Sequence, residues 1–297
     1  MSPEPAIPVI ANPVAGRRRG RKSAEDLKEA LRRAGIPSEI HWTEGAEQTT
    51  RIAASLAEGA RRIVVCGGDG TVHNVVNAIA GKETALAVVP AGRGNDLARM
   101  LGMPRDPAAI AEVIRADRRR RIDLGRATEA TGRERRFCTV AACGFDAEVA
   151  RRLVHGGPIG GPLAYTYGTA VTLLGYRPRH GRIEGDFGVF EGEFFLAATA
   201  KTSMYGGGMR IAPGASLDDG RLRLCIIRPI SRPVVALLFR RVRAGTHLDH
   251  PAVSYHTTAA VRITTEAPID LYADGEPLAS TPVDLDVLPA ALEVIAP

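Results

Sequence analysis

The sequence predicts an α/β N-terminal domain with a largely parallel sheet, followed by a β-rich C-terminal domain. Up to about residue 124, apolar runs of strand length alternate with amphipathic segments of helix length, which is the pattern of βαβ units. Beyond that point, apolar runs are separated by turns rich in glycine and proline, as in an antiparallel sheet. We therefore expect domains at 1–124 and 125–288, and a C-terminal segment, 289–297, for which a return to the first domain is one option.

Each predicted element of the first domain rests on a local pattern. Leu27 and Leu31 lie four residues apart on an amphipathic segment, and Gly35 follows them as a helix stop. Gly81 ends a later helix in the same way. We expect strands at 7–11, 38–42, 61–66 and 85–89, and helices at 24–34, 46–59, 72–80, 95–101 and 108–116.

The second domain is predicted to consist mostly of strands. Two of its segments, 160–176 and 233–243, have helical spacing instead. The first of these is apolar with arginines at its edge, so it is either a core helix or a helix that docks on anionic headgroups. The expected strands are 136–142, 194–201, 222–228, 259–265, 269–273 and 283–288.

Composition and charge restrict the possible partners. Of the 297 residues, 45% are hydrophobic and 24% charged, as in an ordinary globular protein. The net charge of +6 favours anionic partners, whereas an aromatic content of 5% argues against base stacking, so no nucleic acid is expected. We find no signal peptide, no apolar run of membrane-spanning length and no C-x-x-C pair among the 4 cysteines. These features indicate a cytoplasmic protein, with peripheral contact to the inner face of the membrane as a further option.

The most informative stretch is Ile63–Thr71, in which an apolar run stops at two glycines. The order strand, glycine turn, helix presents backbone N–H groups to a phosphate, and the missing side chains let that backbone approach closely. Asp69 places a carboxylate beside the expected phosphates, which suits a site that also holds a cation or a transferable proton. Phosphate, metal and hydroxyl chemistry is therefore the first hypothesis.

Two more strands end in turns of this kind. One turn runs from Asn12 to Gly16 and the other from Pro90 to Asp96. Because ligands of open α/β sheets bind at the carboxyl ends of the strands, the three turns are expected to converge on one anion. The alternative for each turn alone is an ordinary connection between a strand and a helix.

Acidic residues next to glycines recur in the second domain. Asp218 and Asp219 precede Gly220, and their oxygens suit Mg²⁺, although the spacing alone favours a polar turn between strands. Glu276 follows Asp274 and Gly275, and it is either a general base for a hydroxyl or part of a hairpin.

Taken together, these motifs resemble the diacylglycerol-kinase catalytic-domain family, which includes sphingosine kinases, ceramide kinases and soluble bacterial lipid kinases. Gly67–Thr71, with Asn74 and Asn77 behind it, resembles the nucleotide-binding signature of that family. The first motif is shared with NAD kinases, whereas the ordered set is specific for the family. The remaining motifs, in order, are Asn12-Pro13 with Gly16, Gly92–Asp96 with Ala98-Arg99, Gly206–Gly208, Ala212-Pro213, Asp219-Gly220 and Asp274–Glu276.

The resemblance implies an NAD-kinase/diacylglycerol-kinase-like fold and an ATP- and Mg²⁺-dependent kinase that phosphorylates a lipid hydroxyl, with diacylglycerol and phosphatidic acid as the leading substrate and product. It implies that Glu276 takes the hydroxyl proton and that Asp69 organises the catalytic Mg²⁺ through water. Asp219, with the carbonyls of Ser216 and Arg221, matches a second Mg²⁺ site. Many bacterial members carry threonine in place of Arg93. The implied nucleotide-binding residues are Asn12, Thr43, Gly67, Gly68, Asp69, Gly70, Thr71, Val72, His73, Gly92, Arg93, Asn95 and Asp96.

Other functions fit parts of this pattern. The acceptor alcohol could instead be a sphingoid base, a polyprenol or a glycolipid, because the motifs do not separate these lipids. NAD kinase is a second alternative, and a regulator that binds nucleotide or lipid without catalysis is a third. The expected partners are ATP and a lipid substrate at a membrane surface, and a homodimer is one option.

Overall fold

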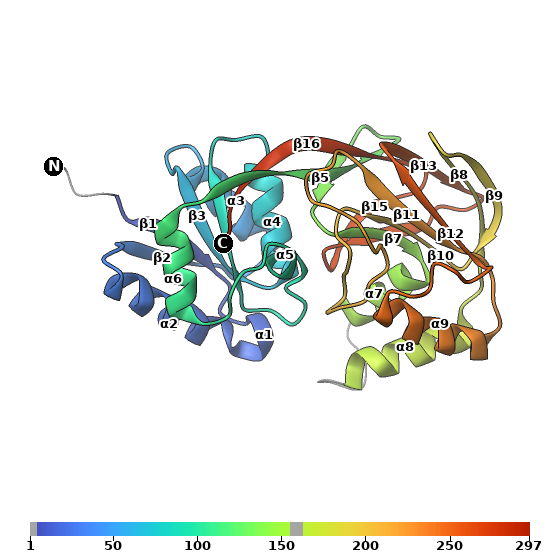
Figure 1. Cartoon of the computed structure of the whole chain (residues 1–297), viewed down its shortest axis with the longest axis horizontal. Coiled ribbons are helices and arrows are strands. Elements are labelled where there is room, and N and C mark those ends of the chain that lie inside the picture. The colour runs from blue at the N-terminus through green and yellow to red at the C-terminus, as the bar shows by residue number, and fades with distance from the viewer. Residues whose placement is uncertain (1–4, 155–162) are drawn as a thin grey trace. The chain divides into compact units, whose positions relative to one another are not determined.

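The computed structural model describes residues 5–154 and 163–297, which form two compact units (Figure 1). The first unit comprises the chain up to Leu124 together with Pro289–Pro297, and the second comprises Gly125–Leu288. Both connections run within long strands, β5 (Arg119–Glu129) and β16 (Val283–Ile295). Each unit is described by itself below.

The sheet of the first unit is parallel, with the strand order β2-β1-β3-β4. The C-terminal end of β16 adds a further parallel strand beside β4, with Val294 opposite Leu86. Every residue of β1 is buried, as expected for a strand that is covered on both faces. The strands are β1 (Ile7–Ala11), β2 (Ser38–Trp42), β3 (Arg62–Gly67) and β4 (Ala85–Pro90).

The strand order also determines where the helices lie. The chain leaves β1 outward to β2 and then returns across β1 to β3, so right-handed connections place the two crossover helices on opposite faces of the sheet. Accordingly, α2 packs against α6, and α3 packs against α4 (Figure 1). The helices are α1 (Ala15–Arg18), α2 (Gly20–Arg33), α3 (Ala46–Leu56), α4 (Asp69–Ile79), α5 (Asp96–Met100) and α6 (Pro107–Ala116).

The second unit is a β-sandwich. One layer joins the first part of β16 to β13, β8 and β9, and also pairs β5 with β6. The other layer is antiparallel, in the order β12-β11-β10-β7-β14-β15. The strands are β6 (Glu134–Phe137), β7 (Val140–Gly144), β8 (Arg179–Gly185), β9 (Gly188–Phe194), β10 (Leu196–Ala200), β11 (Leu222–Ile227), β12 (Val253–Thr258), β13 (Ala260–Thr265), β14 (Asp270–Ala273) and β15 (Glu276–Ser280).

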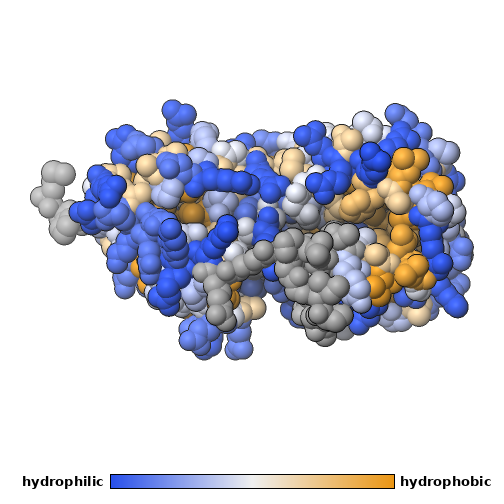
Figure 2. Space-filling view, turned by 90° about the horizontal axis from the view of Figure 1, so that it is seen from below, coloured by the Kyte–Doolittle hydropathy of each residue, from blue (hydrophilic) through white to orange (hydrophobic). Residues whose placement is uncertain are grey.

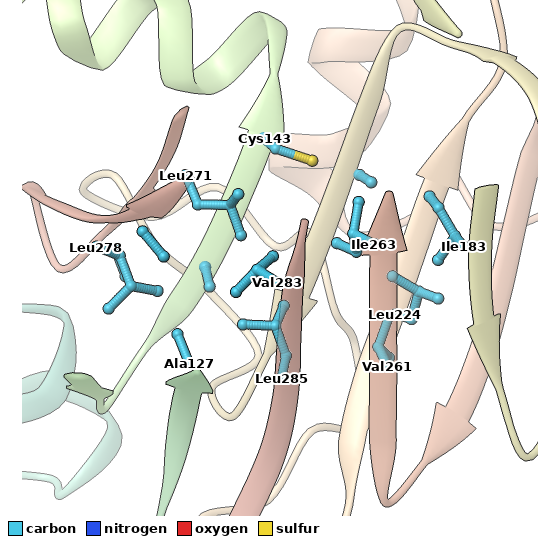
Figure 3. Packing of buried hydrophobic residues seen from close by; sticks show 14 of the residues in the cluster. Ala127, Cys143, Ile183, Leu224, Val261, Ile263, Leu271, Leu278, Val283 and Leu285 are labelled. Atoms are coloured by element: carbon cyan, nitrogen blue, oxygen red, sulfur yellow. The ribbon is translucent and has the colours of Figure 1, made fainter. Parts of the chain in front are cut away.

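Two apolar clusters build the interior of this unit. Between the layers, Leu224, Ile263 and Leu285 belong to one cluster, in which side chains from both sheets meet (Figure 3). On the other face of the β12-β15 layer, Phe145, Phe195 and other side chains pack with the helices that cover it. These helices are α7 (Phe145–Val154), α8 (Leu163–Gly175) and α9 (Arg232–Ala244).

Several elements differ from the sequence-based expectation. The helix expected at 72–80 begins at Asp69, because Gly68 already serves as its N-cap. The strand expected at 194–201 is two strands, since the chain passes from one layer to the other at Phe195. Helix α7 was not expected, and it follows β7 with no intervening turn. Of the helix expected at 160–176, residues 160–162 lie outside the described residues.

Candidate functional site

The turns after β1, β3 and β4 are in direct contact with one another. Asn12 donates its backbone N–H to the carbonyl oxygen of Cys66 over 3.2 Å, and Ala91 donates to the carbonyl oxygen of Gly67 over 3.1 Å. The side-chain amide of Asn12 lies 3.4 Å from Oγ1 of Thr71. The parallel sheet thus brings together, at the carboxyl ends of its central strands, motifs that are up to 80 residues apart.

Glycine is required where these turns meet. A Cβ atom added to Gly92 would lie 2.4 Å from Cα of Gly68, which is closer than any real side chain approaches. A Cβ atom on Gly16, whose φ is +56°, would lie 2.2 Å from the carbonyl oxygen of Ala91. Side chains at these positions would push the turns apart, so the glycines allow the backbones to touch.

Asp69 connects the second turn to the third. Its Oδ2 accepts the backbone N–H of Asn95 over 2.9 Å, and its Oδ1 accepts that of Asp96 over 2.7 Å. Asn95 is left-handed, with φ +54°, and its side chain closes the turn by accepting the N–H of Gly92 over 2.7 Å and donating to its carbonyl oxygen over 2.9 Å. The Asp69 carboxylate therefore fixes the conformation of residues 92–96.

The start of α4 has the features of a general anion-binding arrangement. Its N-cap, Gly68, has no side chain that could bond to the first N–H groups of the helix. An uncapped helix N-terminus at the end of a buried strand is a general phosphate-binding arrangement. The side chains of Val72 and His73 are each only 4% exposed, and Asn77 bonds to the carbonyl oxygen of His73 over 3.0 Å, so these three residues pack within the unit.

The other residues implied for the nucleotide lie around these turns. Thr43 is buried, and its N–H and hydroxyl both bond to the carbonyl oxygen of Ala11, at 2.9 and 3.4 Å. Arg93 is exposed at the tip of the third turn. Trp42 directly precedes Thr43. The guanidinium of Arg21 lies 4.7 Å from the centre of the Trp42 ring and forms a cation–π pair with it.

In the second unit, Asp274 shapes the hairpin between β14 and β15. Asp274 and Gly275 both have positive φ, +55° and +85°, as in a type I′ turn. The Asp274 carboxylate accepts the backbone N–H groups of Cys138 and Thr139, at 3.1 and 2.9 Å, and also the Thr139 hydroxyl. This carboxylate thus fixes the hairpin to the start of β7.

Glu276 is half-buried at the first position of β15, directly after this turn. The guanidinium of Arg135 interacts electrostatically with it and donates to the carbonyl oxygen of the neighbouring Pro277 over 2.5 Å. The hairpin therefore holds the Glu276 carboxylate in a defined place beside a cation, and a carboxylate in that setting can accept a proton from a substrate hydroxyl.

The residues implied for a second Mg²⁺ lie just before β11. Nζ of Lys201 is 3.3 Å from Oδ1 of Asp219 and 2.9 Å from the carbonyl oxygen of Arg221. The second carboxylate oxygen of Asp219 accepts from the guanidinium of Arg223 over 2.5 Å. The hydroxyl of Ser216 bonds to Asp218. The donors thus already surround a side-chain cation, and in this arrangement they do not fit a divalent metal.

Sequence reasoning missed the roles of Lys201, Thr139 and Asp146. Lys201 directly follows the apolar strand β10, where a lysine is normally expected to reach solvent, and a fully buried lysine gives no local signal. Asp146 lies in the first turn of α7, and its Oδ2 is buried without a hydrogen-bond partner among the described residues. Burial raises the pKa of Asp146 to about 7.

Comparisons with known proteins agree along nearly all of the chain. A family model described as diacylglycerol kinase catalytic domain matches residues 6–127, and one described as YegS C-terminal NAD kinase beta sandwich-like domain matches residues 139–296. A protein named diacylglycerol kinase from Mycobacterium tuberculosis is 34% identical over 296 residues, which cover 98% of this chain and 95% of the relative. One from Staphylococcus saprophyticus is 29% identical over 293 residues, which cover 97% of this chain and 94% of the relative.

A solved structure shows the same fold. A crystal structure titled as a diacylglycerol kinase from Bacillus anthracis str. Sterne matches with a TM-score of 0.75 and 22% sequence identity. The match covers 98% of this chain and 97% of that chain. At this identity, the likeness establishes the α/β domain with its β-sandwich partner and nothing beyond the fold.

Proposed function

Because this chain belongs to the diacylglycerol kinase family and is therefore a kinase, we propose that it transfers the γ-phosphoryl group of ATP to the hydroxyl of diacylglycerol and forms phosphatidic acid. The observation that carries this proposal is the contact of three glycine turns around Asp69. Such a cradle of backbone N–H groups is suited to the phosphates of a nucleotide.

In the proposed complex, the N–H groups at the start of α4 and those of Arg93 and Gly94, at the tip of the third turn, bind phosphate oxygens. Asp69 uses its two oxygens to hold that turn, and a carboxylate has about four acceptor positions, so it can also orient water on a metal. The donor chemistry at Asp69 therefore fits Mg²⁺, which would neutralise phosphate charge when bound.

Glu276 is proposed as the general base. It would accept the proton of the lipid hydroxyl while the hydroxyl oxygen attacks the γ-phosphorus and ADP leaves. The turn at Asp274 and Gly275 supports this role, because it fixes the carboxylate that follows it.

We also propose that α8 and α9 touch the membrane that contains the lipid. Leu174 and Leu237 are 66% and 59% exposed, and Arg232 of α9 donates to the carbonyl oxygen of Leu174. Hydrophobic side chains gather on this face of the second unit (Figure 2). Arg240 and Arg243 are exposed on α9 and would favour anionic headgroups. Within residues 5–154 and 163–297, no helix has the length and apolar character needed to cross a membrane.

The test is a mass-spectrometric screen of a lipid extract incubated with the protein, ATP and Mg²⁺. We expect phosphatidic acid to be the new phosphorylated lipid, and omission of ATP should abolish it. Phosphorylation of a sphingoid base, polyprenol or glycolipid in its place would reassign the acceptor. Phosphorylation of added NAD without any lipid product would overturn the proposal.

A further inference from the structure

The side chain of Lys201 is fully buried, which is rare for a lysine. A buried ammonium is stable only where an opposite charge and hydrogen-bond acceptors replace its water. Asp219 supplies the charge, and the carbonyl oxygen of Arg221 supplies a second acceptor, at 3.3 and 2.9 Å from Nζ. These are two of the three ligand positions that the family resemblance implies for a second Mg²⁺.

A metal cannot share this place with Nζ. Mg²⁺ binds oxygen ligands at about 2.1 Å. An ion between Oδ1 of Asp219 and the carbonyl oxygen of Arg221 would therefore occupy the space that the ammonium fills. The ion would also lie close to the guanidinium of Arg223, which binds the other oxygen of Asp219.

The local charge balance leads to the same conclusion. The Asp219 carboxylate accepts the N–H of Arg221 over 3.0 Å and contacts the Arg223 guanidinium and the Lys201 ammonium. The Asp219 carboxylate thus already faces two side-chain cations, and both would repel a divalent ion at the same place.

We infer that Lys201 is the resident cation of this loop, and that its ammonium replaces the divalent metal which the family resemblance implies at Asp219. The second unit then reaches its folded form without a metal ion. The residues involved all lie in the second unit. The inference is therefore independent of the proposed lipid acceptor and of any Mg²⁺ that accompanies the nucleotide.

The backbone of Lys201 is also linked, through Thr139, to the hairpin that carries Glu276. The backbone N–H of Lys201 donates to the carbonyl oxygen of Thr139 over 2.8 Å, and Thr139 in turn donates to the carboxylate of Asp274. Residue 201 therefore joins the start of β7 through its backbone, and its side chain contacts the Asp219 loop.

The test measures thermal unfolding and Mn²⁺ binding of the nucleotide-free, full-length protein. For the wild type, we expect the same Tm in EDTA and in millimolar MgCl₂, and no Mn²⁺ bound at Asp219. In Lys201→Ala, the space that Nζ fills and the Asp219 carboxylate become available to a metal ion. The Tm of this variant should fall in EDTA and recover by roughly 5–10 °C when Mg²⁺ is about a hundredfold above its Kd.

Two controls assign the response to this site. Asp219→Asn in the Lys201→Ala background should remove the recovery by Mg²⁺. Lys82→Ala is the control, because Lys82 is exposed in the first unit and donates to the carbonyl oxygen of Ala54; this variant should not respond to metal.

The inference is overturned if the wild type binds Mn²⁺ without nucleotide and Asp219→Asn abolishes that binding. The inference is also overturned if Lys201→Ala folds and its Tm does not change with Mg²⁺. If Lys201→Ala does not fold, the wild-type titration alone decides, since it needs no substitution.

Discussion

The backbone N–H of Asn95 donates to the carboxylate of Asp69 over 2.9 Å, across 26 residues of sequence. The N–H of Asp96 donates to the same carboxylate. Asp69, the first residue of α4, therefore holds the turn after β4 in place. Asp69 thus has a structural role in shaping this turn, in addition to the metal-organising role that we propose for it.

We expect Asp69→Ala to lower kcat/KM for lipid phosphorylation by at least about 100-fold, equivalent to about 2.7 kcal/mol. The substitution removes the acceptor of two N–H groups and the carboxylate beside the phosphates. Circular dichroism should show a folded protein. Asp69→Asn keeps one acceptor oxygen and should weaken ATP binding less than alanine does. Unchanged activity in the alanine variant would refute both roles of Asp69.

Gly92→Ala should raise the KM for ATP at least about tenfold, because the added Cβ would lie 2.4 Å from Cα of Gly68 and must separate the two turns. Gly59→Ala is the matched control, since no atom lies within 4 Å of the Cβ that it adds. Steady-state kinetics with varied ATP distinguish the two variants. Equal KM values would show that close approach of these turns is not needed for the nucleotide.

Asp146 should make stability depend on pH. Burial raises its pKa from 3.8 to about 7, so the folded protein keeps a proton that the unfolded chain loses between about pH 4 and pH 7. Its contribution to the free energy of unfolding therefore falls as pH rises through that window. Asp146→Asn should be more stable than the wild type above pH 7, by roughly 2–4 kcal/mol.

Thermal unfolding at a series of pH values checks the role of Asp146. The Tm of the wild type should fall more steeply between about pH 4 and pH 7 than that of Asp146→Asn. Asp249→Asn, at an exposed position, should retain the wild-type slope. Parallel curves for wild type and Asp146→Asn would show that this carboxyl does not carry the shifted pKa.

Leu237→Glu should reduce binding to anionic phospholipid vesicles about tenfold or more, since it replaces an exposed apolar side chain of α9 by a carboxylate. Vesicle co-sedimentation measures the effect. Val189→Glu changes a residue of β9 that is 52% exposed and should leave binding unaltered. Equal losses in both variants would point to a general charge effect and away from a docking face on α8 and α9.

The sequence was most informative where local pattern and tertiary structure coincide. The buried strands and their glycine turns are visible in the printed residues, because a run such as Ile63–Cys66 stops abruptly at Gly67 and Gly68. The fold class followed from the same alternation of elements, and the comparisons confirm it.

Other features depend on contacts between distant segments and could not be predicted locally. Thr139 and Asp274 are 135 residues apart, and only the folded sheet brings them together. Strand β5 begins with three arginines and reads as a solvated basic run, although Ile122 and Leu124 later in the strand are buried. The burial of Lys201 likewise depends on the loop before β11, far from it in the sequence.

The most direct measurement is phosphatidic acid formation from diacylglycerol in mixed vesicles, with ATP, Mg²⁺ and equimolar NAD present. We expect the wild type to phosphorylate the lipid and not NAD. Glu276→Gln, which keeps the shape of the side chain but cannot accept a proton, should reduce the rate at least about 100-fold with little change in the KM for ATP. Phosphorylation of NAD alone, or an unchanged lipid rate in Glu276→Gln, would contradict the proposed reaction and its base.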